Sequence, residues 1–89
     1  MKIVRYSTQF RKDFKRYRNQ PRKIEKLLQI VKMFENEVPI PVEMKPHVLT
    51  GNYAGCWECH IENDYLLIWI DETEQVIKLL RLGTHSELF

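Results

Sequence analysis

Three histidines, His47, His60 and His85, lie in the C-terminal half of this 89-residue chain, together with Asp64 and Arg81. Histidine titrates near neutral pH, so two of them can act as general base and general acid. Arginine offers a fixed charge and planar donors that suit phosphate oxygens. These residue types could cleave a phosphodiester bond. Alternatively, a single histidine in a strand can be structural, and Asp64 also suits a turn.

The segment Cys56-Trp57-Glu58-Cys59-His60 matches the C-x-x-C-H pattern of covalent haem attachment. Its composition is typical of a β-strand, in which residues three apart point to opposite faces. Cys56 and Cys59 therefore cannot both reach one haem edge or one metal ion. We expect two semi-buried thiols, no metal site and no cofactor.

The composition is that of one soluble globular domain spanning residues 1–89, with 44% hydrophobic and 29% charged residues. No run of 18 apolar residues is present, and the N-terminal segment MKIVRYSTQF lacks the apolar centre of a secretory signal. We therefore expect a cytoplasmic protein without a membrane partner, whose cysteines stay reduced.

The positive charge is concentrated in the first part of the chain. Residues 1–35 contain eleven Lys or Arg and three Asp or Glu, whereas residues 36–89 contain three and nine. A basic half of this kind indicates either a solvated surface or a surface that binds nucleic acid.

The N-terminal half predicts one strand and two helices. Residues 2–7 form a short strand, and Ser7 suits the N-cap of a helix. Pro21 suits the first turn of a second helix, which should end before the segment VPIP. The apolar positions of the two helices recur at helical spacing: Phe10, Phe14 and Tyr17, then Ile24, Leu27, Leu28, Val31 and Phe34.

The C-terminal half predicts a meander of strands. Three prolines enforce an extended loop over residues 38–46. Strands follow at 56–62, 65–71 and 75–82, with a possible short strand near Val48. Asn63 and Asp64 tolerate the left-handed conformation of a tight hairpin, and Gly83 ends the last strand.

This order, β-α-α-β-β-β, predicts an α+β fold: a small antiparallel sheet of three to five strands, with two N-terminal helices on one face. By strand parity, Arg81 shares a face with Ile77 and Leu79, and Lys78 lies on the other. A charge at the end of an apolar stripe must meet water, an anion or a partner, or extend over the sheet edge.

The segments HVLTGNYAGCWECHIENDYLLIWI and LLRLGTHSELF resemble the YafQ branch of the RelE toxin superfamily, ribosome-dependent mRNA endoribonucleases of bacterial toxin–antitoxin pairs. The family pattern joins an H-x-L-x-G segment, a G-x-x-x-x-H strand, an acidic turn before D-aromatic-L-L-I-Y, and a C-terminal R-x-G-T-H-x-x-L-F. The basic N-terminal half, with YSTQFRKDFKR, also matches. Tyr65 stands where this branch often has tryptophan.

The resemblance implies a sheet backed by two helices, with the site on its concave face. RNA is cut without metal when its 2′-OH attacks the adjacent phosphate. His60 and His85 would move protons, in roles left open, His47 would complete the site, and Asp64 would orient a histidine and raise its pKa or accept a proton itself. The implied functional positions are His47, His60, Asp64, Arg81, His85 and Phe89.

At the C-terminus, Gly83 would allow a turn, and Phe89 would either stack on a base or fill the core. The basic helices would dock on ribosomal RNA, with mRNA as substrate and a cognate antitoxin that covers the basic surface or the site. The residues expected to bind RNA or ribosome are Arg11, Lys12, Lys15, Arg16, Arg18, Arg22, Lys23 and Lys26.

Two other functions fit parts of the sequence. A toxin of the ParE branch shares the fold but acts on DNA gyrase and lacks the nuclease residues, so the three histidines argue against it. A non-catalytic RNA-binding module would use the basic helices alone.

Overall fold

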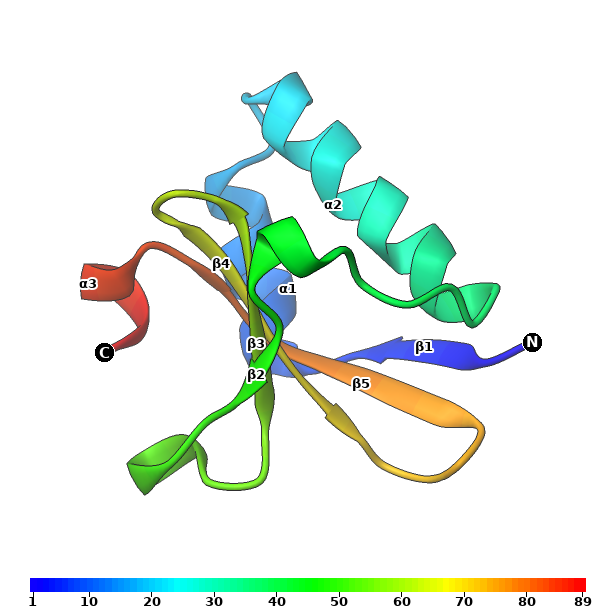
Figure 1. Ribbon diagram of the computed structural model, residues 1–89. Helices are drawn as coiled ribbons and strands as arrows, with labels where there is room; N and C mark the ends of the chain where they lie inside the picture. The colour runs from blue at the N-terminus through cyan, green and yellow to red at the C-terminus, as the bar shows by residue number, and fades with distance from the viewer.

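A computed structural model describes residues 1–89, and the predicted order of elements is confirmed (Figure 1). Two one-turn 3-10 helices and a C-terminal helix are additional to the predicted elements. No helix has the length and apolar character needed to cross a membrane. The elements are β1 (Ile3–Tyr6), α1 (Thr8–Arg16), α2 (Pro21–Glu35), the 3-10 turn Val42–Met44, β2 (His47–Val48), the 3-10 turn Gly51–Tyr53, β3 (Trp57–Glu62), β4 (Tyr65–Asp71), β5 (Val76–Gly83) and α3 (His85–Leu88).

Local signals fix where the two main helices begin. The Ser7 hydroxyl accepts a hydrogen bond from the backbone N–H of Phe10 at 2.9 Å, as expected of an N-cap. Pro21 occupies the first position of α2, where no backbone donor is needed. The loop predicted over residues 38–46 is irregular except for one 3-10 turn, after which Lys45 adopts a positive φ of 52°.

The sheet is mixed, with strand order β1-β5-β4-β3-β2. The pairs β2–β3, β3–β4 and β4–β5 are antiparallel, as the meander predicted. β1 instead runs parallel to β5, with Ile3 opposite Val76. Hairpin connections dictate direction only for strands adjacent in sequence, and β1 is separated from β5 by both helices and the rest of the sheet.

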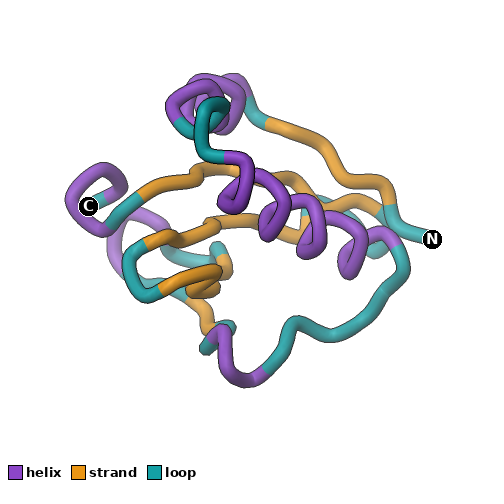
Figure 2. Tube along the Cα trace, turned by 90° about the horizontal axis from the view of Figure 1, so that it is seen from above, coloured by secondary structure: helices purple, strands orange, loops and turns teal.

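Both long helices contribute to the core on one face of the sheet, and α3 contributes Leu88 to the cluster on the opposite face. Figure 2 shows the N-terminus and the C-terminal helix at opposite ends of the molecule. The helix-side core contains Phe10, Tyr17 and Leu27 from the N-terminal half, together with Cys59, Tyr65, Leu67, Trp69, Leu79 and Leu82 from the sheet. A smaller apolar cluster lies on the open face: Cys56, Leu66, Ile68 and Leu88. The site described below is built on this open face.

The two cysteines lie in different clusters, so the prediction that they occupy opposite faces is confirmed. Both are free and buried. Burial raises the pKa of the Cys59 thiol to about 12, which keeps it protonated and unreactive near neutral pH.

The predicted face of Arg81 is wrong. A register shift places Trp69 opposite Leu79 but Ile68 opposite Arg81, so Leu80 is an extra residue in β5. Such a bulge reverses the parity of the residues that follow it. Arg81 therefore lies on the open face, opposite Ile68, rather than beside Leu79.

The β3–β4 hairpin has the predicted two-residue loop, Asn63-Asp64, but neither residue has a positive φ. The register shifts by one residue between His60 and Glu62, next to the turn. This irregularity lets the strands connect without the left-handed conformation that the loop composition would permit.

Candidate active site

Three histidines from three different elements meet on the open face. His47 is in β2, His60 is in β3, and His85 is the first residue of α3. The ring centroids of His47 and His60 are 6.2 Å apart, and those of His60 and His85 are 5.7 Å apart. The side chains of His47 and His85 are about half exposed, at 46% and 55%, so a ligand could reach them.

Asp64 holds His85 from the hairpin turn. Its Oδ1 accepts hydrogen bonds from the backbone N–H of His85 and from Nδ1 of the same residue, both at 2.8 Å. The backbone hydrogen bond, followed by the ring contact, lowers the pKa of the Asp64 carboxyl group. An ionised carboxylate only accepts, so Nδ1 of His85 carries a proton and Nε2 is left to face a substrate.

Glu58 is a site residue that the sequence analysis missed. It is 3% exposed, and its Oε1 lies 3.3 Å from His47 Nε2 and 3.6 Å from His60 Nε2. Its other oxygen, Oε2, is buried without a hydrogen-bond partner. Glu58 and His60 are two apart in β3 and so share a face, which is the signal that could have identified Glu58.

The ring of His47 is fixed on its other side by Nδ1, which lies 2.7 Å from the carbonyl oxygen of Lys45. A carbonyl accepts, so Nδ1 donates. The Nε2 atom of the same ring therefore faces the Glu58 carboxyl group, 3.3 Å away.

The guanidinium group of Arg81 donates hydrogen bonds to two side chains of the protein. Its Nε donates to Asp13 Oδ2 at 2.8 Å, NH2 donates to Asp13 Oδ1 at 3.4 Å, and NH1 donates to the Tyr53 hydroxyl at 3.2 Å. The Asp13 side chain is fully buried and also accepts from the backbone N–H of Leu82 at 3.0 Å. The hydrogen bond to Asp13 raises the pKa of Arg81. Asp13 and Tyr53 were not predicted as site residues.

α3 positions His85 and was not predicted. Thr84 and Glu87 form a capping box, a Thr-x-x-Glu signal that is readable in the sequence. Glu87 also accepts from the Tyr17 hydroxyl at 2.6 Å and pairs with Arg16 at 3.0 Å, so α3 is tied to α1. A Cβ at Gly83 would lie 2.7 Å from Glu87 Oε1, which shows how closely this strand end approaches α3.

Phe89 does not fill the core, because it is 62% exposed. Leu88, at 5% exposure, takes the apolar position instead. The Phe89 ring packs edge-on against Tyr53 at 5.4 Å and lies 6.3 Å from the ring of His85. An exposed aromatic ring beside the histidines could stack on a base.

The predicted basic surface divides into two groups. Arg16 pairs with Glu87, while Lys23 and Lys26 both pair with Glu62. These pairs lower the positive potential near the hairpin. No ion pair engages the other predicted cations, which are all exposed: Arg11, Lys12, Lys15, Arg18 and Arg22.

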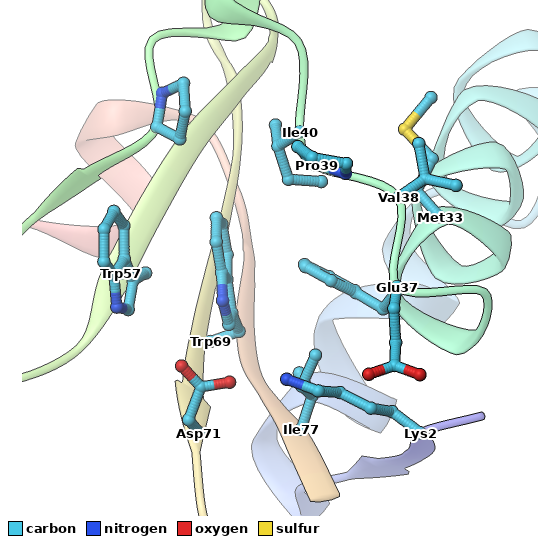
Figure 3. A pocket seen from close by; sticks show the side chains of 12 residues that line it. Lys2, Met33, Glu37, Val38, Pro39, Ile40, Trp57, Trp69, Asp71 and Ile77 are labelled. Atoms are coloured by element: carbon cyan, nitrogen blue, oxygen red, sulfur yellow. The ribbon is translucent and has the colours of Figure 1, made fainter. Parts of the chain in front are cut away.

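A pocket of about 510 Å³ lies on the helix side, between α2, the proline loop and the sheet (Figure 3). Trp57 and Trp69 stand side by side in its wall, with Asp71 near one end. No predicted site residue lines this pocket. The candidate site lies outside this pocket, on the open face. No three His, Cys, Asp or Glu side chains in the chain are placed to hold a metal ion.

Comparisons with known proteins match nearly the whole chain to one family of toxins. The model of a family described as "Bacterial toxin of type II toxin-antitoxin system, YafQ" matches residues 2–89. The mRNA interferase toxin YafQ of Escherichia coli K12 is 32% identical over 87 residues, which are 97% of this chain and 94% of that protein.

Two solved structures have the same fold. The E. coli DinJ–YafQ complex contains a chain that matches with a TM-score of 0.84 and 31% identity, covering 100% of this chain and 99% of that one. A metal-bound toxin from Helicobacter pylori matches with a TM-score of 0.87 and 32% identity, covering 100% of both chains. This chain therefore belongs to the YafQ family of bacterial toxins of type II toxin–antitoxin systems.

Proposed function

We propose that this toxin is an mRNA interferase, an endoribonuclease that cuts mRNA on the ribosome without a metal ion. The observation that carries the proposal is the meeting of His47, His60 and His85 on one exposed face, with the ring of His85 oriented by Asp64. The E. coli relative carries the name mRNA interferase toxin, which supports the substrate class.

In the proposed reaction, one histidine removes the proton from the 2′-OH of the RNA, whose oxygen then attacks the adjacent phosphorus. The bond to the 5′-oxygen breaks, and a second histidine protonates that oxygen. The products are a 2′,3′-cyclic phosphate and a 5′-OH end. His60 and His85 are the candidate pair, because their rings lie 5.7 Å apart and can flank one phosphodiester group. Which of them is the acid stays open.

His47 would act with Glu58. The Oε1 atom of the buried Glu58 lies within 3.6 Å of the Nε2 atoms of His47 and His60 and would orient both rings. His47 would complete the site beside the pair that moves protons. Glu58 itself is buried and would act as a positioning residue.

Arg81 would contribute less charge than an isolated arginine. A guanidinium has five N–H donors, and the contacts with Asp13 and Tyr53 use three of them. Two remain for phosphate oxygens, but the Asp13 carboxylate offsets much of the positive charge. Phe89 would stack on a base next to the cut.

Docking on the ribosome would rely on the exposed cations of α1, α2 and the turn between them. Their contacts with rRNA phosphates would be dependent on salt and largely independent of sequence. The DinJ–YafQ complex of E. coli supports a cognate antitoxin as the second partner. The H. pylori relative is metal-bound, so the proposed metal-free reaction needs a direct test in EDTA.

The test is cleavage of a defined mRNA by the purified toxin, with and without programmed ribosomes, in buffers with and without EDTA. We expect ribosome-dependent cuts that persist in EDTA and leave 5′-OH and 2′,3′-cyclic phosphate ends. His85→Ala and His60→Ala should each lower the rate by about 100-fold or more. Gln29→Ala, an exposed change on α2, is the matched control.

Three outcomes would contradict the proposal. Cuts lost in EDTA and restored by a divalent cation would show a metal-dependent reaction. Cleavage of free mRNA at the same rate would show that the reaction does not depend on the ribosome. Growth arrest without any cut RNA would favour a gyrase-directed toxin or a non-catalytic RNA-binding module.

A further inference from the structure

Tyr53 lies in the loop between β2 and β3, at the end of a one-turn 3-10 helix. The glycines that flank it, Gly51 and Gly55, have φ angles of 72° and 86°, a region that other L residues rarely adopt. The backbone N–H of Cys56 donates to the Tyr53 carbonyl oxygen at 2.9 Å and closes the turn. The loop is therefore compact, and it holds the Tyr53 ring partly buried against the apolar cluster of the open face.

The hydroxyl group of Tyr53 joins β5 to the end of α3. NH1 of Arg81 donates to the hydroxyl oxygen at 3.2 Å, and the hydroxyl group donates to the carbonyl oxygen of Leu88 at 3.0 Å. These are the only possible directions, because a guanidinium group has no acceptor and a carbonyl oxygen has no proton to donate. One hydroxyl group therefore satisfies both neighbours, and a phenylalanine at this position would satisfy neither.

The aromatic ring of Tyr53 supports Phe89. The two ring centroids are 5.4 Å apart with an interplanar angle of 80°, which is an edge-to-face contact. The ring of His85 also neighbours Phe89 but lies farther away, at 6.3 Å. Tyr53 is thus the nearer aromatic support of a ring that is otherwise exposed.

α3 depends on such contacts because it has only four residues. A single helical turn has little stability of its own in water. Its start is held by the capping box and by Asp64, which accepts from the backbone N–H of His85. Its end is held by the Leu88 side chain and by the Tyr53 hydroxyl group. Loss of this hydroxyl group should therefore loosen the end of α3.

Resting on the nuclease activity proposed above, we propose that Tyr53 is a positioning residue of the catalytic face. Its hydroxyl group orients Arg81 and the end of α3, and its ring orients Phe89. Asp13 holds Nε and NH2 of Arg81, and Tyr53 holds NH1, so the plane of the guanidinium group is fixed from two sides. One N–H remains on each terminal nitrogen, and together they can meet two oxygens of one phosphate.

The variant Tyr53→Phe removes the hydroxyl group and keeps the ring. In the cleavage assay with programmed ribosomes, we expect kcat to fall about tenfold and KM to change by less than about threefold, because Arg81 would meet charge that develops in the transition state. Tyr6→Phe is the matched control. It removes a hydroxyl group from β1, where the ring stacks on Phe10 of α1, and should leave both constants unchanged. Urea midpoints show that each variant is folded.

The role of the ring is tested in combination with Phe89. Tyr53→Leu removes the aromatic edge as well as the hydroxyl group, so its KM should be about threefold higher than that of Tyr53→Phe. In a Phe89→Ala background this difference in KM should vanish, because no ring is left to orient. A role of Tyr53 in filling space alone would give the same difference in both backgrounds.

Hydrogen exchange tests the anchoring of α3 without RNA cleavage. The backbone N–H groups of Leu88 and Phe89 make the last hydrogen bonds of the helix, at 3.0 Å and 2.8 Å. In Tyr53→Phe we expect both amides, followed by NMR, to exchange about tenfold faster than in the wild type. In Tyr6→Phe they should exchange at the wild-type rate.

Three results would overturn the proposal: a wild-type kcat in Tyr53→Phe, a difference in KM that persists without the Phe89 ring, or unaltered exchange of the α3 amides. If the wild-type toxin cuts no RNA, the nuclease proposal has failed, and the exchange rates alone decide whether Tyr53 anchors α3. The two failures are therefore recognised separately.

Discussion

Replacing Arg81 with alanine should destabilise the fold strongly enough to confound any activity measurement. Asp13 is fully buried, and Arg81 supplies its charge compensation through contacts at 2.8 Å and 3.4 Å. Breaking a buried pair by removing one partner costs about 3–5 kcal/mol. We expect the lower end, about 3 kcal/mol, because Asp13 retains the Leu82 N–H and lies 4.0 Å from Arg16.

The assay is urea unfolding followed by the fluorescence of Trp57 and Trp69, which lie in the sheet. In a thermal unfolding curve of the same variant, a loss of 3 kcal/mol lowers Tm by about 12–24 °C for a domain of this size. The double variant Arg81→Met/Asp13→Asn removes both charges and should recover part of the loss. The reasoning is refuted if Arg81→Ala costs less than about 1 kcal/mol, the value of an exposed pair, or if the effects of the two changes simply add.

The remaining predictions concern Glu58, Gly83 and Glu87. Glu58→Gln should lower the cleavage rate on the order of 100-fold while leaving the urea midpoint unchanged or higher, because it removes the charge of a buried carboxylate, one of whose oxygens has no hydrogen-bond partner. An unchanged rate would exclude a role for Glu58. Gly83→Ala should cost about 1–3 kcal/mol, since its Cβ would lie 2.7 Å from Glu87 Oε1, and an unaltered midpoint would contradict the described packing of α3. The hydrogen bond from Tyr17 lowers the pKa of Glu87 in the folded state, so its stabilisation is present above the ordinary glutamate pKa of about 4.3 and is lost as the pH falls through the lower folded value. The difference in urea midpoint between wild type and Glu87→Gln should therefore shrink below about pH 4, and a difference that stays constant down to pH 3 would show that Glu87 does not titrate in this way.

The elements that the sequence predicted best are those with a strong local pattern. The strand at 65–71 was predicted with its observed bounds, because turn residues precede a continuous β-rich run. The start of α2 followed from Pro21 alone. The parallel pairing of β1 could not be predicted in this way, because it depends on a contact between the two ends of the chain.

The sequence predicted which residues form the candidate site, but not the hydrogen bonds and ion pairs that join them to the rest of the protein. The side of the sheet on which Arg81 lies was wrong, because alternation does not reveal a bulge, although the adjacent apolar pair Leu79-Leu80 interrupts the period of two. Nothing in the sequence singled out Asp13, which is one of three Asp or Glu residues among eleven Lys or Arg in residues 1–35. Asp13 is buried because α1 packs against β5 beyond the end of β1. A local sequence pattern does not predict such a contact between distant segments.

The distribution of carboxylates supports a separation between the proposed RNA-docking surface and the proposed catalytic face. On the open face Arg81 is paired with Asp13, His85 with Asp64, and His47 and His60 share Glu58. With neutral histidines these groups are three carboxylates and one arginine, which offer RNA no net positive charge, so the proposed role of this face is acid–base chemistry rather than attraction. Six of the nine Lys and Arg residues without carboxylate partners are instead on α1, α2 and their connecting turn, where salt rather than pH controls their attraction: Arg11, Lys12, Lys15, Arg18, Arg22 and Lys32. Binding to RNA should therefore respond mainly to ionic strength, and the cleavage step mainly to pH.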